Sequence, residues 1–226
     1  MDKFVIRKNK PLSDKPPIFV YTDGACSNNG RANAKAGFGV YFGENDERNV
    51  SESYNGVQTN NVAEMLAIIR ALTILKDDIE QGQEVVIYSD SKYSIRCCTT
   101  YGEKCEKKNW TNPNSKDKEI PNLEIVQAGY NFCKKYTNIK FIHVAAHTGR
   151  EDIHSIGNDH ADRLANLAIG VTPTSNDKKK IYLNVPFKEK DTAKKLGTQW
   201  DPNKKKWFIY NTNPNKGLVL GNWSIE

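Results

Sequence analysis

The sequence predicts a mixed α/β fold, a five-stranded sheet flanked by helices, followed by a small α+β domain. Two observations predict the first part: β-branched runs alternate with segments of helical periodicity, and three strands precede the first long helix. A third observation, the linker-like composition of residues 171–179, separates the two parts. We therefore expect a flexible lead-in at 1–17, a main domain at 18–170, this linker, and an accessory domain at 180–226.

Five strands are predicted in the main domain, and two of them end beside an acidic residue. Residues 18–21 and 84–88 are β-branched, apolar runs that stop at Asp23 and Asp90. The other strands are expected at 36–42, 49–54 and 139–145. If the two acid-ended strands are neighbours, both carboxylates lie at the same edge of the sheet, where open α/β sheets place their sites.

Helices are predicted between and after these strands. The first follows the polar cluster 59–61, which is typical of a helix cap, and apolar residues continue at helical spacing to Ile79. A loop is predicted at 147–157, and residues 102–121, rich in Lys, Asn and Pro around Trp110, predict an exposed basic excursion. The other helices are expected at 91–101, 122–136 and 158–169.

Length and composition exclude several classes of protein. The 226 residues can bury a core without disulfides, and no stretch approaches the roughly 20 apolar residues of a membrane span. We therefore expect an intracellular protein, cytoplasmic or nuclear, with no membrane partner and with a monomer as the default state. The 5 cysteines contain no Cys-x-x-Cys pair, which argues against a disulfide framework and against a zinc site.

Positive charge is concentrated in the accessory domain. The whole chain carries +6, whereas residues 178–226 contain 11 Lys and 4 acidic residues, a net +7 that leaves −1 for residues 1–177. Such an asymmetry indicates a polyanionic partner, and we expect the accessory domain to bind nucleic acid. The alternative on charge alone is a solvated lysine-rich face.

Four carboxylates stand at the edges of predicted elements. Asp23 and Asp90 end strands, Glu64 falls in the first turn of the long helix, and Asp162 falls one turn into the last helix. Each alone has a structural alternative as a cap or a turn residue. Four together would repel one another. A rise in their pKa values or the binding of cations would relieve this repulsion. Oxygen ligands without Cys or His favour Mg²⁺ or Mn²⁺, and two such ions would serve phosphodiester hydrolysis.

Four short motifs contain these acids, and a fifth lies between the last two of them. They are TDGACSNNG at 22–30, TNNVAE at 59–64, YSDSKY at 88–93, HVAAHTG at 143–149 and GNDHADRLA at 157–165. In this order they closely resemble the motifs of cellular ribonucleases H of the type 1 class, over about residues 18–170. The resemblance implies a ribonuclease H-like sheet and endonucleolytic hydrolysis of the RNA strand of RNA–DNA hybrids, leaving 5′-phosphate and 3′-hydroxyl ends.

The resemblance also implies the catalytic residues. Two Mg²⁺ ions, replaceable by Mn²⁺, would be held by four ligands, namely Asp23, Glu64, Asp90 and Asp162. His147, on a mobile loop before the last ligand, would assist proton transfer or product release; its alternative is a loop histidine with a structural hydrogen bond. The loop at 149–157 looks several residues longer than in the family, which makes His154 a second candidate.

Seven further residues are implied to contact the hybrid. Four of them would read the ribose 2′-hydroxyl, which distinguishes RNA from DNA, namely Cys26, Asn29, Asn60 and Asn61. Thr59 and Asn122 would form a pocket for a phosphate of the DNA strand, and Tyr101 stands in the aromatic DNA groove where a Trp is common. As alternatives, Asn60 is only a helix cap and Asn29 only a turn residue.

The accessory domain reads as two strands around a short helix. The strands are expected at 181–186 and 207–210, with a helix at 188–196 and a turn at 201–204. This segment resembles a small uncharacterised domain attached to nucleic-acid enzymes. Three tryptophans are interpreted as its core, with stacking platforms as the alternative, namely Trp200, Trp207 and Trp223.

Two other functions are weighed against hybrid cleavage. The first is a relative of the same fold that acts on DNA, such as a transposase, an integrase or a junction resolvase; the Asn-rich segments beside the acids argue against it. The second is a non-catalytic module that binds hybrids or RNA. The presence of all four acids argues against this second reading.

Overall fold

The chain folds into two compact units, Met1–Thr172 and Pro173–Glu226, each with its own sheet and core. The computed structural model describes residues 15–115, 117–145, 152–171, 180–211, 213 and 215–225. The predicted lead-in and linker fall almost wholly outside these residues. All 5 cysteines are free thiols.

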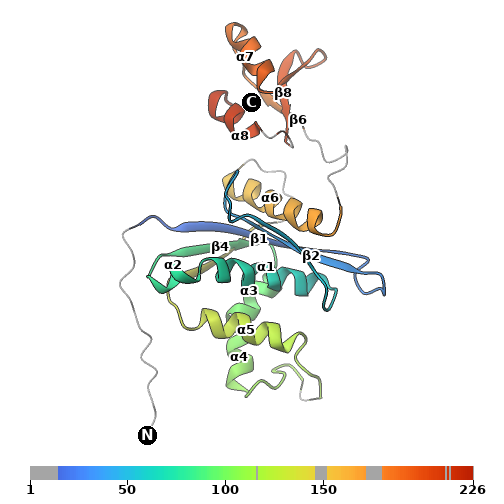
Figure 1. Cartoon of the computed structure of the whole chain (residues 1–226), viewed down its shortest axis with the longest axis vertical. Helices are drawn as coiled ribbons and strands as arrows, with labels where there is room; N and C mark the ends of the chain where they lie inside the picture. Colours follow the sequence, from blue (N-terminus) through green and yellow to red (C-terminus); the bar gives the residue numbers. More distant parts are fainter. Residues whose placement is uncertain are drawn as a thin grey trace. The chain divides into compact units, whose positions relative to one another are not determined.

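A five-stranded mixed sheet forms the centre of the first unit, which confirms the predicted fold class (Figure 1). The strand order is β3-β2-β1-β4-β5. The strands are β1 (Ile18–Ser27), β2 (Lys35–Tyr41), β3 (Val50–Tyr54), β4 (Val85–Ser89) and β5 (Ile139–His143). β1 pairs antiparallel with β2 and parallel with β4, which pairs parallel with β5. Every residue of β4 is buried, as expected for a parallel strand covered on both faces.

The central strand β1 is longer than predicted. Its parallel pairing with β4 ends at Thr22, opposite Ser89, whereas its antiparallel pairing with β2 continues to Ser27, opposite Lys35. The prediction that the strand stops at residues 22–24 was therefore wrong. β2 continues to form backbone hydrogen bonds with β1 after the pairing with β4 has ended. Asp23 lies one residue beyond the last pair with β4, where the sheet opens on one side.

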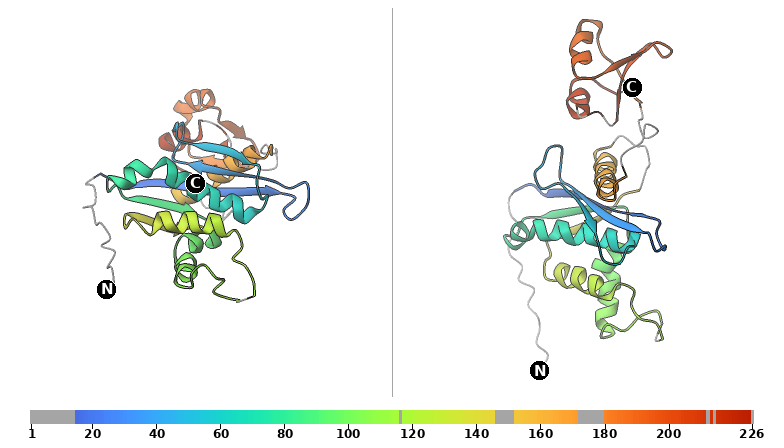
Figure 2. Two further views of the ribbon diagram at one scale, coloured as in Figure 1. Left: turned by 60° about the horizontal axis from the view of Figure 1, so that its bottom comes forward. Right: turned by 45° about the vertical axis from the view of Figure 1, so that its right-hand side comes forward.

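Helices cover both faces of this sheet. In Figures 1 and 2, α6 lies on one face, and α1, α3 and α5 lie on the other. The described helices of the unit are α1 (Asn60–Ile74), α2 (Lys76–Glu80), α3 (Lys92–Cys98), α4 (Thr100–Lys107), α5 (Leu123–Cys133) and α6 (Ile153–Ala168). The larger core lies between β1, β4, α1, α3 and α5, and a smaller one lies between the sheet and α6. None of the described helices is both long enough and apolar enough to cross a membrane.

Two helices predicted as continuous are interrupted. The first breaks at Leu75, which has φ −92° and ψ 10° and separates α1 from α2. The second breaks at Thr99, with φ −129° and ψ −106°, after which α4 runs on to Lys107. The predicted basic excursion is therefore partly helical, and Trp110 packs edge-on against Tyr130 with ring centroids 6.1 Å apart.

Helix α6 begins five residues earlier than predicted. Asp152 caps it by accepting hydrogen bonds from the backbone N–H groups of His154 and Ser155, at 3.0 and 3.1 Å. Residues 153–157, which were predicted to lie in the loop, are therefore helical. His154 stacks on Tyr88 with ring centroids 4.2 Å apart, and its Nδ1 lies 3.1 Å from the hydroxyl of Tyr21. We therefore interpret His154 as a packing residue between α6 and the sheet.

The second unit is a three-stranded antiparallel sheet with helices against one face. The strand order is β6-β8-β7, from β6 (Lys180–Leu183), β7 (Gln199–Asp201) and β8 (Lys206–Tyr210). A 3₁₀ turn (Phe187–Glu189) leads into α7 (Lys190–Lys195), and α8 (Lys216–Asn222) follows the sheet. β7 and α8 were not predicted. Trp207 and Trp223 are buried in the core as expected, whereas Trp200 is 49% exposed.

Candidate active site

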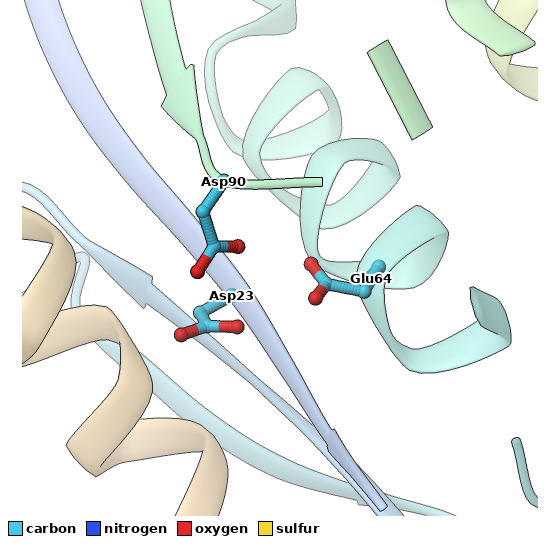
Figure 3. Close-up of side chains that lie close together, drawn as sticks. All are labelled: Asp23, Glu64 and Asp90. Atoms are coloured by element: carbon cyan, nitrogen blue, oxygen red, sulfur yellow. The ribbon is translucent and has the colours of Figure 1, made fainter. Parts of the chain in front are cut away.

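Three carboxylates from different elements converge at the edge of the main sheet. Asp23 comes from β1, Glu64 from α1, and Asp90 from the residue directly after β4. Each offers an oxygen, and these oxygens all lie within 4.8 Å of one another. Figure 3 shows the three side chains pointing toward one another. The sequence prediction that the two acid-ended strands are neighbours is confirmed by their parallel pairing.

The register of the sheet places the two aspartates side by side. Thr22 and Ser89 are the last residues through which β1 and β4 pair with each other, and Asp23 and Asp90 are the residues that follow them. Parallel strands present equivalent positions at the same edge of a sheet. The convergence of these two carboxylates therefore follows directly from the strand pairing.

Gly24 lets helix α1 bring Glu64 to the same edge. A Cβ at Gly24 would lie 2.2 Å from the backbone nitrogen of Glu64 and 2.5 Å from the carbonyl carbon of Ala63. Only glycine permits this contact between two backbones. Thr59 caps the helix by accepting the N–H of Val62 at 3.3 Å. Glu64 is the fifth residue of α1 and lies in its second turn, not in the first turn as predicted.

Burial and mutual repulsion make the carboxylates unfavourable as a set of bare anions. Burial and the charges of Asp90 and Asp162 raise the pKa of Asp23 well above its ordinary value, although the Gly24 N–H donates to its Oδ1 at 2.7 Å. Burial and the charges of Asp23 and Asp90 likewise raise the pKa of Glu64. Oε2 of Glu64 is buried and has no hydrogen-bond partner within the described part of the chain. These residues fit a divalent cation, which would satisfy that oxygen and offset the repulsion.

Asp162 acts on the cluster through its charge. It is the tenth residue of α6, nearly three turns from its start and not one turn as predicted. Its charge raises the pKa of both Asp23 and Glu64, although it does not belong to the group of oxygens within 4.8 Å. Asn166 donates to its Oδ1 at 2.9 Å. The structure thus brings the fourth predicted ligand within electrostatic reach of the other three.

Asn158 is a site residue that the sequence reasoning missed. It lies on α6 one turn before Asp162, is 3% exposed, and donates through Nδ2 to Oδ2 of Asp90 at 3.4 Å. Its Oδ1 is buried without a partner among the described residues. The available signal was its position four residues before Asp162, which places both on one side of a helix. We interpret Asn158 as a residue that orients Asp90.

Several predicted substrate-binding residues gather where β1 ends and α1 begins. Asn29 accepts the backbone N–H of Asn60 at 3.3 Å, and Sγ of Cys26 lies 3.5 Å from the carbonyl oxygen of Gln58. Asn60 and Asn61 are exposed at the start of α1. The side chain that caps this helix is that of Thr59, so the alternative reading of Asn60 as the cap was wrong.

Asn122 and Tyr101 lie in a different neighbourhood, among α3, α4 and α5. Asn122 has a left-handed backbone, with φ 56° and ψ 37°, and its Nδ2 donates to the hydroxyl of Tyr93 at 3.5 Å. Tyr101 packs against the main core, and burial raises its pKa to about 12. The nearby Cys105 adds to this shift. His147 lies outside the described residues.

Comparison with known families identifies the first unit. The family model described as RNase H matches residues 15–169. The chain belongs to the RNase H family. A second family model, a domain of unknown function named DUF5710, matches residues 180–218. The resemblance seen in the five motifs is thereby confirmed.

Curated RNase H relatives match the same two-thirds of the chain. Ribonuclease H1 of Homo sapiens is 36% identical over 148 residues, which cover 66% of this chain and 48% of that protein. Ribonuclease H of Schizosaccharomyces pombe is 37% identical over 147 residues, which cover 65% of this chain and 50% of that protein. The chain therefore spans about half the length of these relatives.

Solved structures show the same RNase H fold. The RNase H domain of PFV superposes with a TM-score of 0.52 at 21% identity, covering 69% of this chain and 95% of that one. The foamy viral protease-reverse transcriptase, solved in complex with RNA/DNA hybrid, superposes with a TM-score of 0.54 at 21% identity. The match covers 74% of this chain and 23% of that one. These likenesses support the architecture of a mixed sheet flanked by helices.

Proposed function

We propose that this chain is an endoribonuclease that hydrolyses the RNA strand of RNA–DNA hybrids. The observation that carries the proposal is the convergence of Asp23, Glu64 and Asp90 at the edge of an RNase H sheet, with a buried Glu64 oxygen that has no hydrogen-bond partner among the described residues. The names of its relatives support the reaction class, and the hybrid complex of a protein with the same fold supports the substrate.

The proposed cofactor is Mg²⁺, with two ions bound and Mn²⁺ able to substitute. Asp23, Glu64 and Asp90 would hold them together with Asp162. Bound there, the ions would activate a water and stabilise the leaving oxygen, which yields 5′-phosphate and 3′-hydroxyl ends. The chain itself contributes the fixed geometry, because the Gly24 N–H holds Asp23 at 2.7 Å and Asn158 holds Asp90 at 3.4 Å. We assign proton transfer or product release to His147.

Selection of RNA is proposed to depend on the residues beside the cluster. The exposed Asn60 and Asn61, with Asn29 and Cys26, are suited to contact a ribose 2′-hydroxyl, because amide and thiol groups can donate or accept. Thr59 stands at the start of α1, where backbone amides favour a phosphate. The DNA strand would be contacted separately, and the residues proposed for it are Thr59, Asn122 and Tyr101.

A panel of substrates tests this assignment. We expect the protein with Mg²⁺ to cut the RNA of a labelled RNA–DNA hybrid and to leave single-stranded RNA, double-stranded RNA and duplex DNA intact, because the 2′-hydroxyl must be presented in a hybrid helix. Gel analysis of each labelled strand measures this. The metal-free control contains EDTA and should show no cutting. Cutting of duplex DNA, or an intact hybrid with both Mg²⁺ and Mn²⁺, would overturn the proposal.

The second unit is proposed to bind nucleic acid and to raise affinity for the hybrid. Its lysine excess gives residues 178–226 a net +7, which suits contact with phosphates. We further propose that the protein is a monomer that works inside the cell, in the cytoplasm or the nucleus.

Removing the second unit should leave cleavage intact but make affinity for the hybrid less dependent on salt concentration. For a chain ending at Thr172, the slope of log affinity against log salt for the hybrid should fall by roughly 3 if the missing lysines contact about three phosphates. Fluorescence anisotropy at four salt concentrations measures both slopes, and cleavage at low salt confirms that the shortened chain is folded. An identical slope for the two chains would exclude the second unit from substrate binding.

A further inference from the structure

The second unit carries a continuous strip of aromatic and lysine side chains. The strip consists of Phe187, Lys190, Lys194, Trp207 and Trp200. Nζ of Lys190 lies 4.2 Å from the ring centroid of Phe187, and Nζ of Lys194 lies 5.8 Å from that of Trp207. The rings of Trp207 and Trp200 follow, with centroids 5.5 Å apart and planes inclined by 63°. The strip thus places two positive charges between flat apolar surfaces, along α7 and onto β7.

Two rings of the strip are exposed to solvent. Phe187 is 81% exposed and Trp200 is 49% exposed, whereas Trp207 between them is 9% exposed and belongs to the core. The core of the unit is completed by buried residues of the sheet, α7 and α8, so it does not require the other two rings. Phe187 and Trp200 are therefore large aromatic side chains that lie exposed at the two ends of the strip, where they can contact a ligand.

The lysines of the strip are available to a ligand. Lys190 and Lys194 are one helical turn apart on α7, about 6 Å along its axis, and so lie on the same side of the helix. Within the described part of the unit neither forms an ion pair, in contrast to Lys180, which pairs with Asp201 at 2.8 Å. Asp191 is the one acidic residue of α7. The strip therefore presents net positive charge beside its exposed rings.

We propose that this strip binds a single strand of nucleic acid, with bases stacked on Trp200 and Phe187 and phosphates held by Lys190 and Lys194. Exposed rings on either side of two cations match a chain of flat bases joined by anions. A duplex cannot use such rings, because its base faces are covered by neighbouring base pairs. The inference rests on the proposed nucleic-acid binding of the second unit, to which it assigns a surface and a substrate class.

The strip should bind RNA and DNA strands alike. Stacking uses the faces of the bases, and the lysines contact phosphates, so neither interaction involves the 2′-hydroxyl. The second unit would therefore hold an unpaired segment next to the hybrid, and the first unit would select the strand to be cut.

The exposed rings provide the first arm of the test. Binding of labelled 12-nucleotide DNA and RNA strands to the full chain is measured by fluorescence anisotropy in EDTA, which prevents cleavage. Phe187→Ala and Trp200→Ala should each weaken binding of both strands about tenfold, the usual loss when one stacked base loses its platform. Leu218→Ala, at an exposed apolar residue of α8, is the matched control and should bind as the unaltered protein does. Phe187 is so exposed that its removal leaves folding intact.

The lysines provide the second arm. The double variant Lys190→Gln/Lys194→Gln should reduce the salt slope of strand binding by about 1.4, since each phosphate contact on a single strand contributes about 0.7. Lys204→Gln/Lys205→Gln removes the same charge from the β7–β8 turn, where Lys204 lies over Tyr182 and outside the strip, and should leave the slope unchanged. Unaltered strand binding in the strip variants, or an equal loss of salt slope in both double variants, would contradict the proposal that the strip binds a single strand.

The test separates this inference from the proposed reaction. A blunt hybrid without overhangs is incubated in parallel with Phe187→Ala or Trp200→Ala and Mg²⁺. These two variants keep every lysine of the second unit, and both should cut the hybrid at the rate of the unaltered protein. If the strip variants bind strands normally while the hybrid is still cut, the proposal that the strip binds single strands is wrong and the nuclease proposal stands. If the hybrid is never cut while strand binding falls in the strip variants, the nuclease proposal is wrong and the strip stands.

Discussion

Replacing Asp23 by Asn is expected to abolish hybrid cleavage while leaving hybrid binding intact. Asp23 has an oxygen within 4.8 Å of the oxygens of both Glu64 and Asp90, so its loss removes a ligand at the centre of the proposed metal site. A metal site supplies several kcal/mol of transition-state stabilisation, and its loss should reduce kcat by about a thousandfold or more. Single-turnover cleavage and anisotropy with the hybrid measure the two quantities separately.

The same substitution should stabilise the metal-free fold at neutral pH. The folded pKa of Asp23 is raised, so between the ordinary value near 4 and the raised value only the folded state holds the proton. Stability therefore falls as pH rises through this window, and Asn cannot lose stability in this way. Urea unfolding in EDTA should show no gain in stability for Asp23→Asn below the ordinary pKa of about 4, and a gain that grows as pH rises above it.

A matched carboxylate and a metal titration complete this test. Asp77→Asn removes an exposed carboxylate of α2 and should show no such pH-dependent gain. Added Mg²⁺ should stabilise the unaltered protein more than Asp23→Asn, because the cation binds the folded state only. If Asp23→Asn is less stable than the unaltered protein at pH 7 in EDTA, Asp23 serves the fold and not a cation.

Gly24→Ala is expected to damage both stability and activity. The new Cβ would meet backbone atoms at 2.2 and 2.5 Å, and a backbone cannot rotate aside as a side chain can. Overpacking of this kind costs about 1–3 kcal/mol or more. If the chain relieves the clash by moving α1 away from β1, Glu64 leaves the cluster, and a displacement of about 1 Å can cost roughly a hundredfold in rate. Urea unfolding and kcat measure the two effects.

Gly221→Ala is the matched control for that substitution. A Cβ at Gly221 would meet nothing within 4 Å, so this substitution in α8 should not lower stability, and cleavage should equal that of the unaltered protein. Full activity in Gly24→Ala would show that the approach of α1 to β1 does not set the position of Glu64.

Much of the fold was predictable because its signals are local. The apolar runs at 18–21 and 84–88 identified the two central strands, and their pairing then followed the expected neighbour relation. Helix breaks at Leu75 and Thr99 were not predictable, because side-chain periodicity continues across both while only the backbone angles change. The three-residue strand β7 is too short to carry a pattern.

The candidate site was predictable to the extent that its residues carry charge or a motif. Asp23, Glu64 and Asp90 were each recognisable in the sequence as an acidic residue beside an apolar run. Asn158 did not, because a neutral side chain inside a helix has no local signature and its contact with Asp90 exists only in the folded chain. The start of α6 was misplaced for a similar reason, since the cap supplied by Asp152 was read as part of a loop.

The ends of the RNA product test the central claim most directly. Hybrid with a labelled RNA strand is incubated with the protein in Mg²⁺ and in EDTA, and the products are resolved by mass spectrometry. Attack by a water at the carboxylate cluster predicts 5′-phosphate and 3′-hydroxyl ends, formed only when the divalent cation is present. A 2′,3′-cyclic phosphate, which arises when the ribose 2′-hydroxyl is the nucleophile, or any cutting in EDTA would contradict the account.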